Sequence, residues 1–213
     1  MNPINRYVQI VLVETSHPGN IGSVARAMKN MGLSNLSLIN PKTFPHQEAT
    51  ALAGNAVDVL DNAKVFDSIN EAIKDSKVIY ATSARDRTIE WPTLSVKEAA
   101  EEINQLVCED IEVSILFGRE DRGLTNEELQ LANKHLIIPA HPEYPVLNIA
   151  MSTQVICYEL YQAAQDIPAK KWQDFPEYTA EELNNLIDHF NETVSSLDLV
   201  DTDNPKQIMT RME

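Results

Sequence analysis

VETSHPGNIGSVARAMKNMG, residues 13–32, is the stretch that decides the fold. An apolar, strand-like run leads into it, the chain turns at Pro18 and Gly19, and a helical pattern closed by Gly32 follows. Residues 113–129, VSILFGREDRGLTNEEL, repeat this order of strand, glycine-containing loop and helix. Such a loop presents free backbone N–H groups and the positive end of a helix dipole to an anion. Two loops of this kind, each carrying arginine, predict a binding site.

Strands and helices are predicted to alternate along the first 165 residues. Apolar, strand-like runs occur at Val8–Val13, Leu36–Ile39, Val78–Ala81, Val113–Phe117 and Leu136–Ile138. Helical patterns occur at Gly22–Met31, Gln47–Gly54, Ser68–Lys74, Ser95–Val107, Thr125–Ala132 and Leu147–Gln165. This alternation predicts an α/β fold with a parallel sheet, whose ligands bind at the carboxyl ends of the strands. The last helix is apolar on most faces, which is typical of burial in a core or a subunit interface.

The composition predicts one main domain with an extension. The chain has 213 residues and is 43% hydrophobic, enough to bury a core in one domain of about 150 residues. We assign residues 1–165 to this domain. Residues 166–213 begin as a linker and continue with an amphipathic helix predicted at Thr179–Ser195, where Thr179 and Glu182 match a capping box. We expect this segment to be a partial helical extension.

The lack of a long apolar run and the spacing of the cysteines indicate a cytoplasmic protein. No run approaches the roughly 18 apolar residues of a membrane span, and the N-terminus shows no signal-peptide pattern. Cys108 and Cys157 lie far apart in predicted helices, which is typical of reduced thiols. No group of histidines, cysteines and carboxylates has the spacing of metal ligands, so we expect no metal.

The net charge of −15 counts against a nucleic-acid partner, because phosphate binding depends mainly on lysine and arginine. The distribution of charge along the chain weakens this argument against a nucleic-acid partner. Residues 166–213 hold 11 acidic and 4 basic residues, a net charge of −7, which leaves −8 on residues 1–165. Five of the seven arginines lie in or beside the predicted site loops: Arg26, Arg85, Arg87, Arg119 and Arg122. Arginine suits bidentate phosphate contacts, and pairing with neighbouring acids is the alternative for each.

Other ligand-binding motifs do not fit the chain. A dinucleotide site needs G-x-G-x-x-G in the first turn and an acid after the second strand. Here the turn reads Gly19-Asn20-Ile21-Gly22 and the second strand ends in Asn40-Pro41. The sequence also has neither a Gly-Lys-Ser/Thr phosphate loop nor a Gly-x-Ser-x-Gly nucleophile elbow.

A third segment completes a pattern of three motifs. It is residues 137–159, IIPAHPEYPVLNIAMSTQVICYE. Together with NIGSVARAMKNMG (20–32) and FGREDRGL (117–124), it resembles the motifs of the SpoU branch of the SPOUT RNA methyltransferases. The stretch at 13–32 and ATSARDRTIEWP (81–92) are most similar to the TrmJ-type tRNA 2′-O-ribose methyltransferases. The resemblance covers about residues 6–165.

The resemblance implies a parallel sheet whose carboxyl end is tied into a deep trefoil knot. It also implies a homodimer that packs through the knot helices, S-adenosylmethionine as cofactor and tRNA as partner. The implied reaction is 2′-O-ribose methylation of cytidine or uridine at nucleotide 32 of the anticodon loop. The alternatives are 2′-O-methylation of rRNA or of another tRNA position, and a catalytically silent knotted module that binds RNA.

By the same resemblance, backbone groups and apolar walls of several loops bind the cofactor. The implied cofactor-binding residues are Thr82, Ser83, Ala84, Leu116, Phe117, Gly118, Ile137, Ile138, Pro139, Val146, Leu147 and Asn148. Leucine, isoleucine and proline suit an adenine ring held between apolar walls. Gly118 is expected to let the backbone approach the ligand closely.

The resemblance assigns catalysis to Arg26, Asn20, Glu120 and Asn148. The family's usual proposal makes Arg26 the general base, but a guanidinium stays protonated in proteins. We therefore expect Arg26 to contact the phosphate beside the target ribose and to stabilise alkoxide charge. Asn20 and Glu120 are expected to orient Arg26, and Asn148 to position the 2′-hydroxyl or the cofactor. Arg85, Arg87, Arg119 and Arg122 are the further implied RNA contacts, with pairing to Glu120 as the alternative for the last two.

Two features depart from the family pattern. Val146 stands where the third motif usually carries serine two residues before its asparagine, so a hydroxyl is missing from that position. The extension is acidic, whereas related enzymes use a basic helical extension to grip tRNA. We therefore expect weak tRNA binding through three or four phosphate contacts per subunit.

Overall fold

The computed structural model describes residues 3–83, 91–165 and 180–197. Contacts between Cα atoms divide the chain into two units, Met1–Ile167 and Pro168–Glu213, and each is considered by itself. In the second unit, helix α9 spans Ala180–Ser196, close to the helix predicted at 179–195. Its proposed cap Thr179 lies outside the described residues. None of the described helices is both long and apolar enough to cross a membrane.

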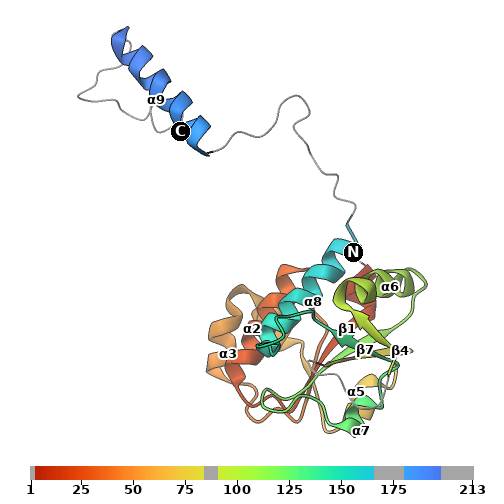
Figure 1. Ribbon diagram of the computed structural model, residues 1–213. Helices are drawn as coiled ribbons and strands as arrows, with labels where there is room; N and C mark the ends of the chain where they lie inside the picture. Colours follow the sequence, from red (N-terminus) through yellow and green to blue (C-terminus); the bar gives the residue numbers. More distant parts are fainter. Residues whose placement is uncertain (1–2, 84–90, 166–179, 198–213) are drawn as a thin grey trace. The chain divides into compact units, whose positions relative to one another are not determined.

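A seven-stranded sheet forms the centre of the first unit (Figure 1). Its order is β3-β2-β1-β6-β4-β7-β5, and the neighbouring strands pair in parallel. The strands are β1 Val8–Val13, β2 Leu36–Ile39, β3 Lys64–Phe66, β4 Val78–Thr82, β5 Thr93–Ser95, β6 Val113–Phe117 and β7 Lys134–Ile137. The predicted parallel α/β fold is confirmed.

Helices cover both faces of this sheet (Figure 1). On one face, α2 contacts α3 and α8, and α8 contacts α6; α5 and α7 lie on the opposite face. The helices of this unit are α1 Pro3–Tyr7, α2 Pro18–Asn30, α3 Gln47–Ala53, α4 Val57–Asp61, α5 Ile69–Ile73, α6 Val96–Cys108, α7 Asn126–Leu129 and α8 Ile149–Ala163, with a 3-10 turn at Gly54–Ala56.

The apolar runs of the central strands explain why both faces are covered. Successive side chains of a strand point to opposite faces. In β1, Ile10 and Leu12 belong to the core cluster that includes residues of α2, α6 and α8. Val11 and Val13 belong to a second cluster with Leu124 of the loop before α7. A strand buried on both sides has no polar face, which is why β1 is apolar apart from Gln9, whose side-chain amide is hydrogen-bonded.

Several predicted boundaries were wrong. Helix α2 begins at Pro18, four residues before the predicted start, so Gly19 and Asn20 belong to the helix and not to a turn. Proline at the first helical position has a preset φ and lacks only an N–H that would be unpaired there. Four further elements were not predicted, because they are three to five residues long and carry too little periodicity: α1, α4, β3 and β5. The predicted helix at 125–132 forms only one turn, α7.

Gly22 determines how closely α2 approaches α3. A Cβ atom at Gly22 would lie 2.1 Å from the backbone oxygen of Ala49, far inside van der Waals contact. Gly22 and Ala49 are both buried. A larger residue at 22 therefore has to push the two helices apart.

Gly22→Ala is expected to destabilise the protein by about 1–3 kcal/mol, because the added methyl overpacks the contact. Elsewhere in a helix the same change stabilises by up to about 1 kcal/mol. The sign of the change in the free energy of unfolding therefore shows whether the α2–α3 contact is tight. Urea unfolding followed by circular dichroism measures the difference. Ser23→Ala, on the next residue of α2, is the control and should shift the free energy of unfolding by less than about 0.5 kcal/mol. A stabilised Gly22→Ala protein would contradict this packing.

Candidate active site

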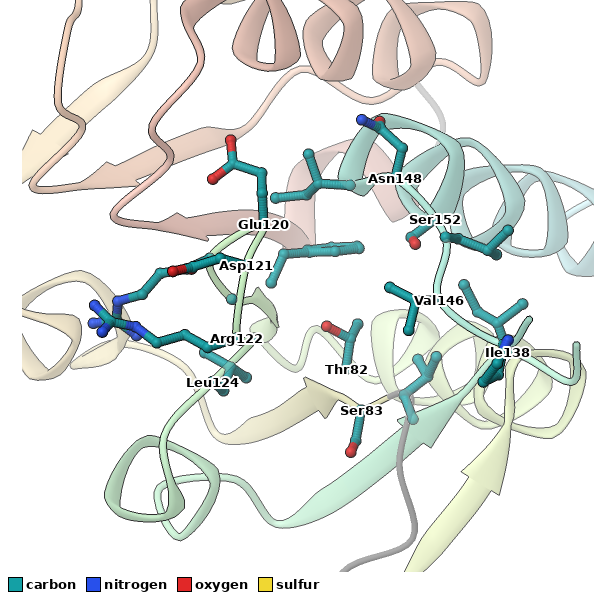
Figure 2. Close-up of a pocket in the computed structure, with 18 of the residues that line it drawn as sticks. Thr82, Ser83, Glu120, Asp121, Arg122, Leu124, Ile138, Val146, Asn148 and Ser152 are labelled. Carbon is teal, nitrogen blue, oxygen red and sulfur yellow. The ribbon is translucent and has the colours of Figure 1, made fainter. Parts of the chain in front are cut away.

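A cavity of about 360 Å³ lies at the carboxyl ends of β4, β6 and β7 (Figure 2). This is the edge of a parallel sheet at which ligands are expected. The loop after β6, the segment after β7 and the first turns of α8 surround it. The lining residues are Thr82, Ser83, Phe117, Gly118, Arg119, Glu120, Asp121, Arg122, Gly123, Leu124, Leu136, Ile138, Tyr144, Pro145, Val146, Leu147, Asn148, Ile149 and Ser152.

Most of the predicted cofactor residues meet at this cavity. Those that line it are Thr82, Ser83, Phe117, Gly118, Ile138, Val146, Leu147 and Asn148. Leu116, Ile137 and Pro139 are not among the lining residues. Leu116 is fully buried, and its carbonyl oxygen accepts a hydrogen bond from the Thr82 hydroxyl at 2.9 Å. Ala84 lies outside the described residues.

The Glu120 carboxylate is the polar centre beside the cavity. It accepts hydrogen bonds from the backbone N–H of Ser16 (3.1 and 3.2 Å), the Ser16 hydroxyl (3.0 Å), the His17 N–H (3.3 Å) and the Asn20 side chain (3.0 Å). Partial burial on its own raises the pKa of this carboxyl, but the hydrogen bonds from Asn20, Ser16 and His17 outweigh burial and lower the pKa to about 2. Glu120 is therefore charged at neutral pH.

Two asparagines extend this arrangement to the third motif. The Asn148 side-chain amide donates to the Asn20 oxygen at 3.2 Å, and the Asn20 amide in turn donates to Glu120. The Asn148 oxygen accepts from the Ala150 N–H at 2.8 Å, so Asn148 also caps α8. The predicted residues Asn20, Glu120 and Asn148, which are up to 128 positions apart, therefore form one hydrogen-bonded chain at the cavity edge.

Arg26 is not hydrogen-bonded to Glu120, Asn20 or Asn148. It is exposed on α2, and it makes no hydrogen bond or ion pair with the residues that the structure describes. The expected orientation of Arg26 by Asn20 and Glu120 is not observed, because these two side chains bond to each other and to Ser16 and Asn148 instead. Its exposed guanidinium, unpaired among the described residues, is thus accessible to a ligand that approaches from solvent.

The other arginines predicted to contact RNA differ in how exposed their side chains are and in their ion pairs. The Arg119 side chain is only 9% exposed and pairs with Glu14 and Glu128, not with Glu120. Arg122 is 65% exposed, lies 3.9 Å from Glu14 and extends away from Val146 (Figure 2). Arg85 and Arg87 lie outside the described residues. Of the two arginines in the second motif, only Arg122 is open to a phosphate.

Gly118 is required for a reason that the sequence did not indicate. A Cβ atom there would lie 2.1 Å from the Gly123 carbonyl carbon and 2.2 Å from the Leu124 nitrogen. The loop closes on itself at this point, where Arg119 and Gly123 exchange two backbone hydrogen bonds. Gly123 has a φ of 72°, in the left-handed region that favours glycine. Both glycines therefore shape the loop that carries Glu120.

The cavity combines apolar walls with polar groups. Val146, Leu147 and Leu124 supply apolar surface, and the Thr82, Ser83 and Ser152 hydroxyls provide polar groups (Figure 2). Such a lining suits a ligand with a planar apolar ring and polar substituents. Sequence reasoning missed Ser16, Glu14 and Ser152; the place of Ser16 directly before His17 in the first loop was the available signal. Among the described residues, no three His, Cys, Asp or Glu side chains form a metal-binding group.

Comparison with known proteins defines the class. The model of the SpoU rRNA Methylase family matches residues 7–158. The tRNA (cytidine/uridine/adenosine-2′-O-)-methyltransferase TrmJ of Pseudomonas aeruginosa is 44% identical over 96% of this chain and 84% of its own length. The tRNA (cytidine/uridine-2′-O-)-methyltransferase TrmJ of Klebsiella pneumoniae is 42% identical over 96% of this chain and 86% of its own length.

A solved structure agrees with this classification. The crystal structure of TrmJ from Z. mobilis ZM4 superposes with a TM-score of 0.69 at 30% identity, over 96% of this chain and 87% of the other. The chain therefore belongs to the SpoU methylase family and, within it, to the TrmJ-type branch.

The low pKa of Glu120 predicts how stability depends on pH. A carboxyl whose pKa is lower in the folded protein stabilises it above the unfolded-state value of about 4.3, and the stabilisation is lost as the pH falls toward 2. Glu120→Gln should therefore lower the free energy of unfolding at pH 7 and differ progressively less from wild type below about pH 4.5. Urea titrations at pH 7, 4 and 3 measure this. The exposed Glu101→Gln is the control; equal differences for Glu120→Gln at all three pH values would contradict the assignment.

Proposed function

We propose that this protein is an S-adenosylmethionine-dependent tRNA 2′-O-ribose methyltransferase that acts on cytidine or uridine at nucleotide 32 of the anticodon loop. The observation that carries the proposal is the hydrogen-bonded chain Glu120–Asn20–Asn148, which joins the three family motifs beside the cavity. The names of the TrmJ relatives support tRNA and ribose 2′-oxygen as the targets. We assign the reaction to residues 1–165 and place the enzyme in the cytoplasm.

The cavity residues fit S-adenosylmethionine. Apolar side chains of Leu124, Val146 and Leu147 suit the faces of an adenine ring, and the Thr82 and Ser83 segment offers polar groups. The cofactor supplies a methyl group already activated on a sulfonium, so the protein's main task is orientation. Val146, in place of the usual serine, contributes a wall to this cavity and no hydrogen bond, so backbone groups have to hold the ribose there.

Arg26 is proposed to act on the RNA side of the site. A guanidinium stays protonated and cannot take the 2′-hydroxyl proton itself. An exposed, unpaired guanidinium can instead contact the phosphate beside the target ribose and stabilise the developing alkoxide. Asn148, held by Asn20, is placed to position the 2′-hydroxyl or the cofactor. Arg122 is a further phosphate contact, as are Arg85 and Arg87.

We further propose that the segments between β6 and α8 form the trefoil knot of this family and that two protomers pack through the knot helices. Helix α8 supports this proposal, since Met151 and Tyr158 on it are 62% and 46% exposed in the single chain. Packing of these side chains against a second copy would remove apolar surface from water. It would also bring arginines of two protomers to one RNA groove, which matters for a chain of net charge −15.

One observation favours a second substrate. The matching family model is described as an rRNA methylase, so rRNA 2′-O-methylation is the alternative. Labelled S-adenosylmethionine, incubated separately with unmodified bulk tRNA and with unmodified rRNA, distinguishes the two. Label in tRNA that maps to nucleotide 32 by primer extension at low nucleotide concentration supports the proposal. Label in rRNA alone supports the alternative, and label in neither indicates a catalytically silent module.

Arg26→Ala is expected to lower the rate of methyl transfer by 10²-fold or more, because it removes a charge that acts in the transition state. Cofactor affinity should change little, since Arg26 does not line the cavity. Single-turnover rates and calorimetric titration of the cofactor measure the two quantities. Lys97→Ala, on the exposed side of α6, is the control. Activity within threefold of wild type would overturn the role of Arg26.

Methyl transfer is expected to proceed without a metal ion. The proposed chemistry needs no Lewis acid, because the methyl donor is already activated. Dialysis against EDTA, followed by assay with pre-folded tRNA, should leave the rate unchanged. A loss of activity that added Mg²⁺ restores, with the RNA fold controlled separately, would show that a metal takes part.

A further inference from the structure

Arg119 is engaged by two carboxylates from different parts of the fold. Its Nε donates to Glu14 Oε2 at 2.7 Å, and its NH2 lies 2.7 Å from Glu14 Oε1. On the other side, NH1 and NH2 donate to Glu128 Oε2 and Oε1 at 2.8 and 2.9 Å. Both pairs are bidentate, and all three guanidinium nitrogens are used. Bidentate arginine–carboxylate pairs are among the strongest and most directional hydrogen-bonded contacts.

The burial of these groups distinguishes them from a surface ion pair. The side chains of Arg119 and Glu128 are 9% and 16% exposed, and that of Glu14 is 39% exposed. The hydrogen bonds that Arg119 donates to Glu14 and Glu128 raise the pKa of Arg119, and Arg119 lowers the pKa of Glu14. With all three nitrogens bonded to carboxylates and the side chain 9% exposed, this guanidinium has little surface left for a phosphate. Arg119 is thus poorly placed for the RNA contact that the sequence predicted.

Because Arg119 directly precedes Glu120, its ion pairs with Glu14 and Glu128 also affect where the Glu120 carboxylate lies. The two neighbouring residues bind the same segment: Arg119 pairs with Glu14, and Glu120 accepts from Ser16, His17 and Asn20. Glu128 completes the attachment, since it caps α7 through the Thr125 N–H at 2.7 Å while it binds Arg119. The loop after β6 is thereby held at both the end of β1 and the start of α7.

We propose that Arg119 is a positioning residue, which clamps the loop between Glu14 and Glu128 so that the Glu120 carboxylate meets Asn20. This proposal rests on the proposed function for its kinetic consequence, whereas its structural part is independent of the reaction. The clamp fixes the loop, the loop fixes Glu120, and Glu120 orients the Asn20–Asn148 amides at the cavity edge. Arg119 belongs to the cavity lining, but its guanidinium is bonded to Glu14 and Glu128, so it acts on the site through the loop.

Kinetics of Arg119→Gln separate positioning from RNA binding. A clamp predicts that kcat falls 10-fold or more while the KM for tRNA stays within twofold, and that Arg119→Lys, which keeps one ion pair, gives an intermediate kcat. A phosphate contact predicts the reverse: a raised KM, an unchanged kcat and a salt dependence of tRNA binding shallower by roughly 0.7–0.9 in log–log slope. That second pattern would overturn the proposal.

A double-mutant cycle tests whether Arg119 acts through Glu120. If it does, adding Arg119→Gln to Glu120→Gln lowers kcat by less than threefold further, although each change alone lowers it 10-fold or more. Independent, multiplicative losses would overturn the coupling. Lys134→Gln is the matched control, because it also breaks a partly buried pair, with Glu102 at 2.6 Å, but lies at the start of β7, outside the cavity lining.

Hydrogen–deuterium exchange tests the clamp without any assay of activity. In Arg119→Gln and Arg119→Lys, peptides that cover residues 14–20 and 118–124 should exchange at least fivefold faster than in wild type, whereas Lys134→Gln should leave them unchanged. Unchanged exchange in both Arg119 variants would overturn the proposal. If the wild-type protein methylates no RNA, the proposed function fails, but this exchange experiment still decides whether the clamp exists.

Discussion

A single carboxylate, that of Glu120, joins the three parts of the site. Its charge is partly withdrawn from water, and such a group has to be hydrogen-bonded to be stable. The donors come from the segment after β1, where Ser16 and His17 contribute backbone N–H groups and Asn20 contributes its amide. Since Asn20 also accepts from Asn148, the start of α8 is placed by the same carboxylate. The cavity edge depends on this one hydrogen-bonded unit.

The backbone of the second loop is shaped to deliver that carboxylate. Gly118 permits a contact with the Gly123 backbone that any side chain would block, and the two hydrogen bonds between residues 119 and 123 close the loop. The ion pairs of Arg119 then attach the loop to its neighbours on both sides. A site built in this way is organised before a ligand arrives, which lowers the cost of ordering it on binding.

The arginines of the site differ in their pairing according to how deeply they are buried. The buried arginine is neutralised by two carboxylates, and the exposed ones, Arg26 and Arg122, remain open to solvent. Arginines of the first kind stabilise the loop, and arginines of the second kind are available to a polyanion. In a chain with a net charge of −15, exposed arginines such as Arg26 and Arg122 offer local positive charge to phosphate.

The sequence by itself determined the class of fold and the members of the hydrogen-bonded chain. Mostly apolar runs predicted five strands, because strands buried on both faces carry few polar residues, and the motif resemblance identified Asn20, Glu120 and Asn148. Tertiary structure alone decided the edge strands β3 and β5, which are too short for a pattern, the role of Gly118 and the pairing of Arg119. The physical reason is that an arginine's partner depends on which carboxylates the fold brings within about 3 Å. Glu14 and Arg119 are 105 positions apart, and no local pattern encodes such a distance.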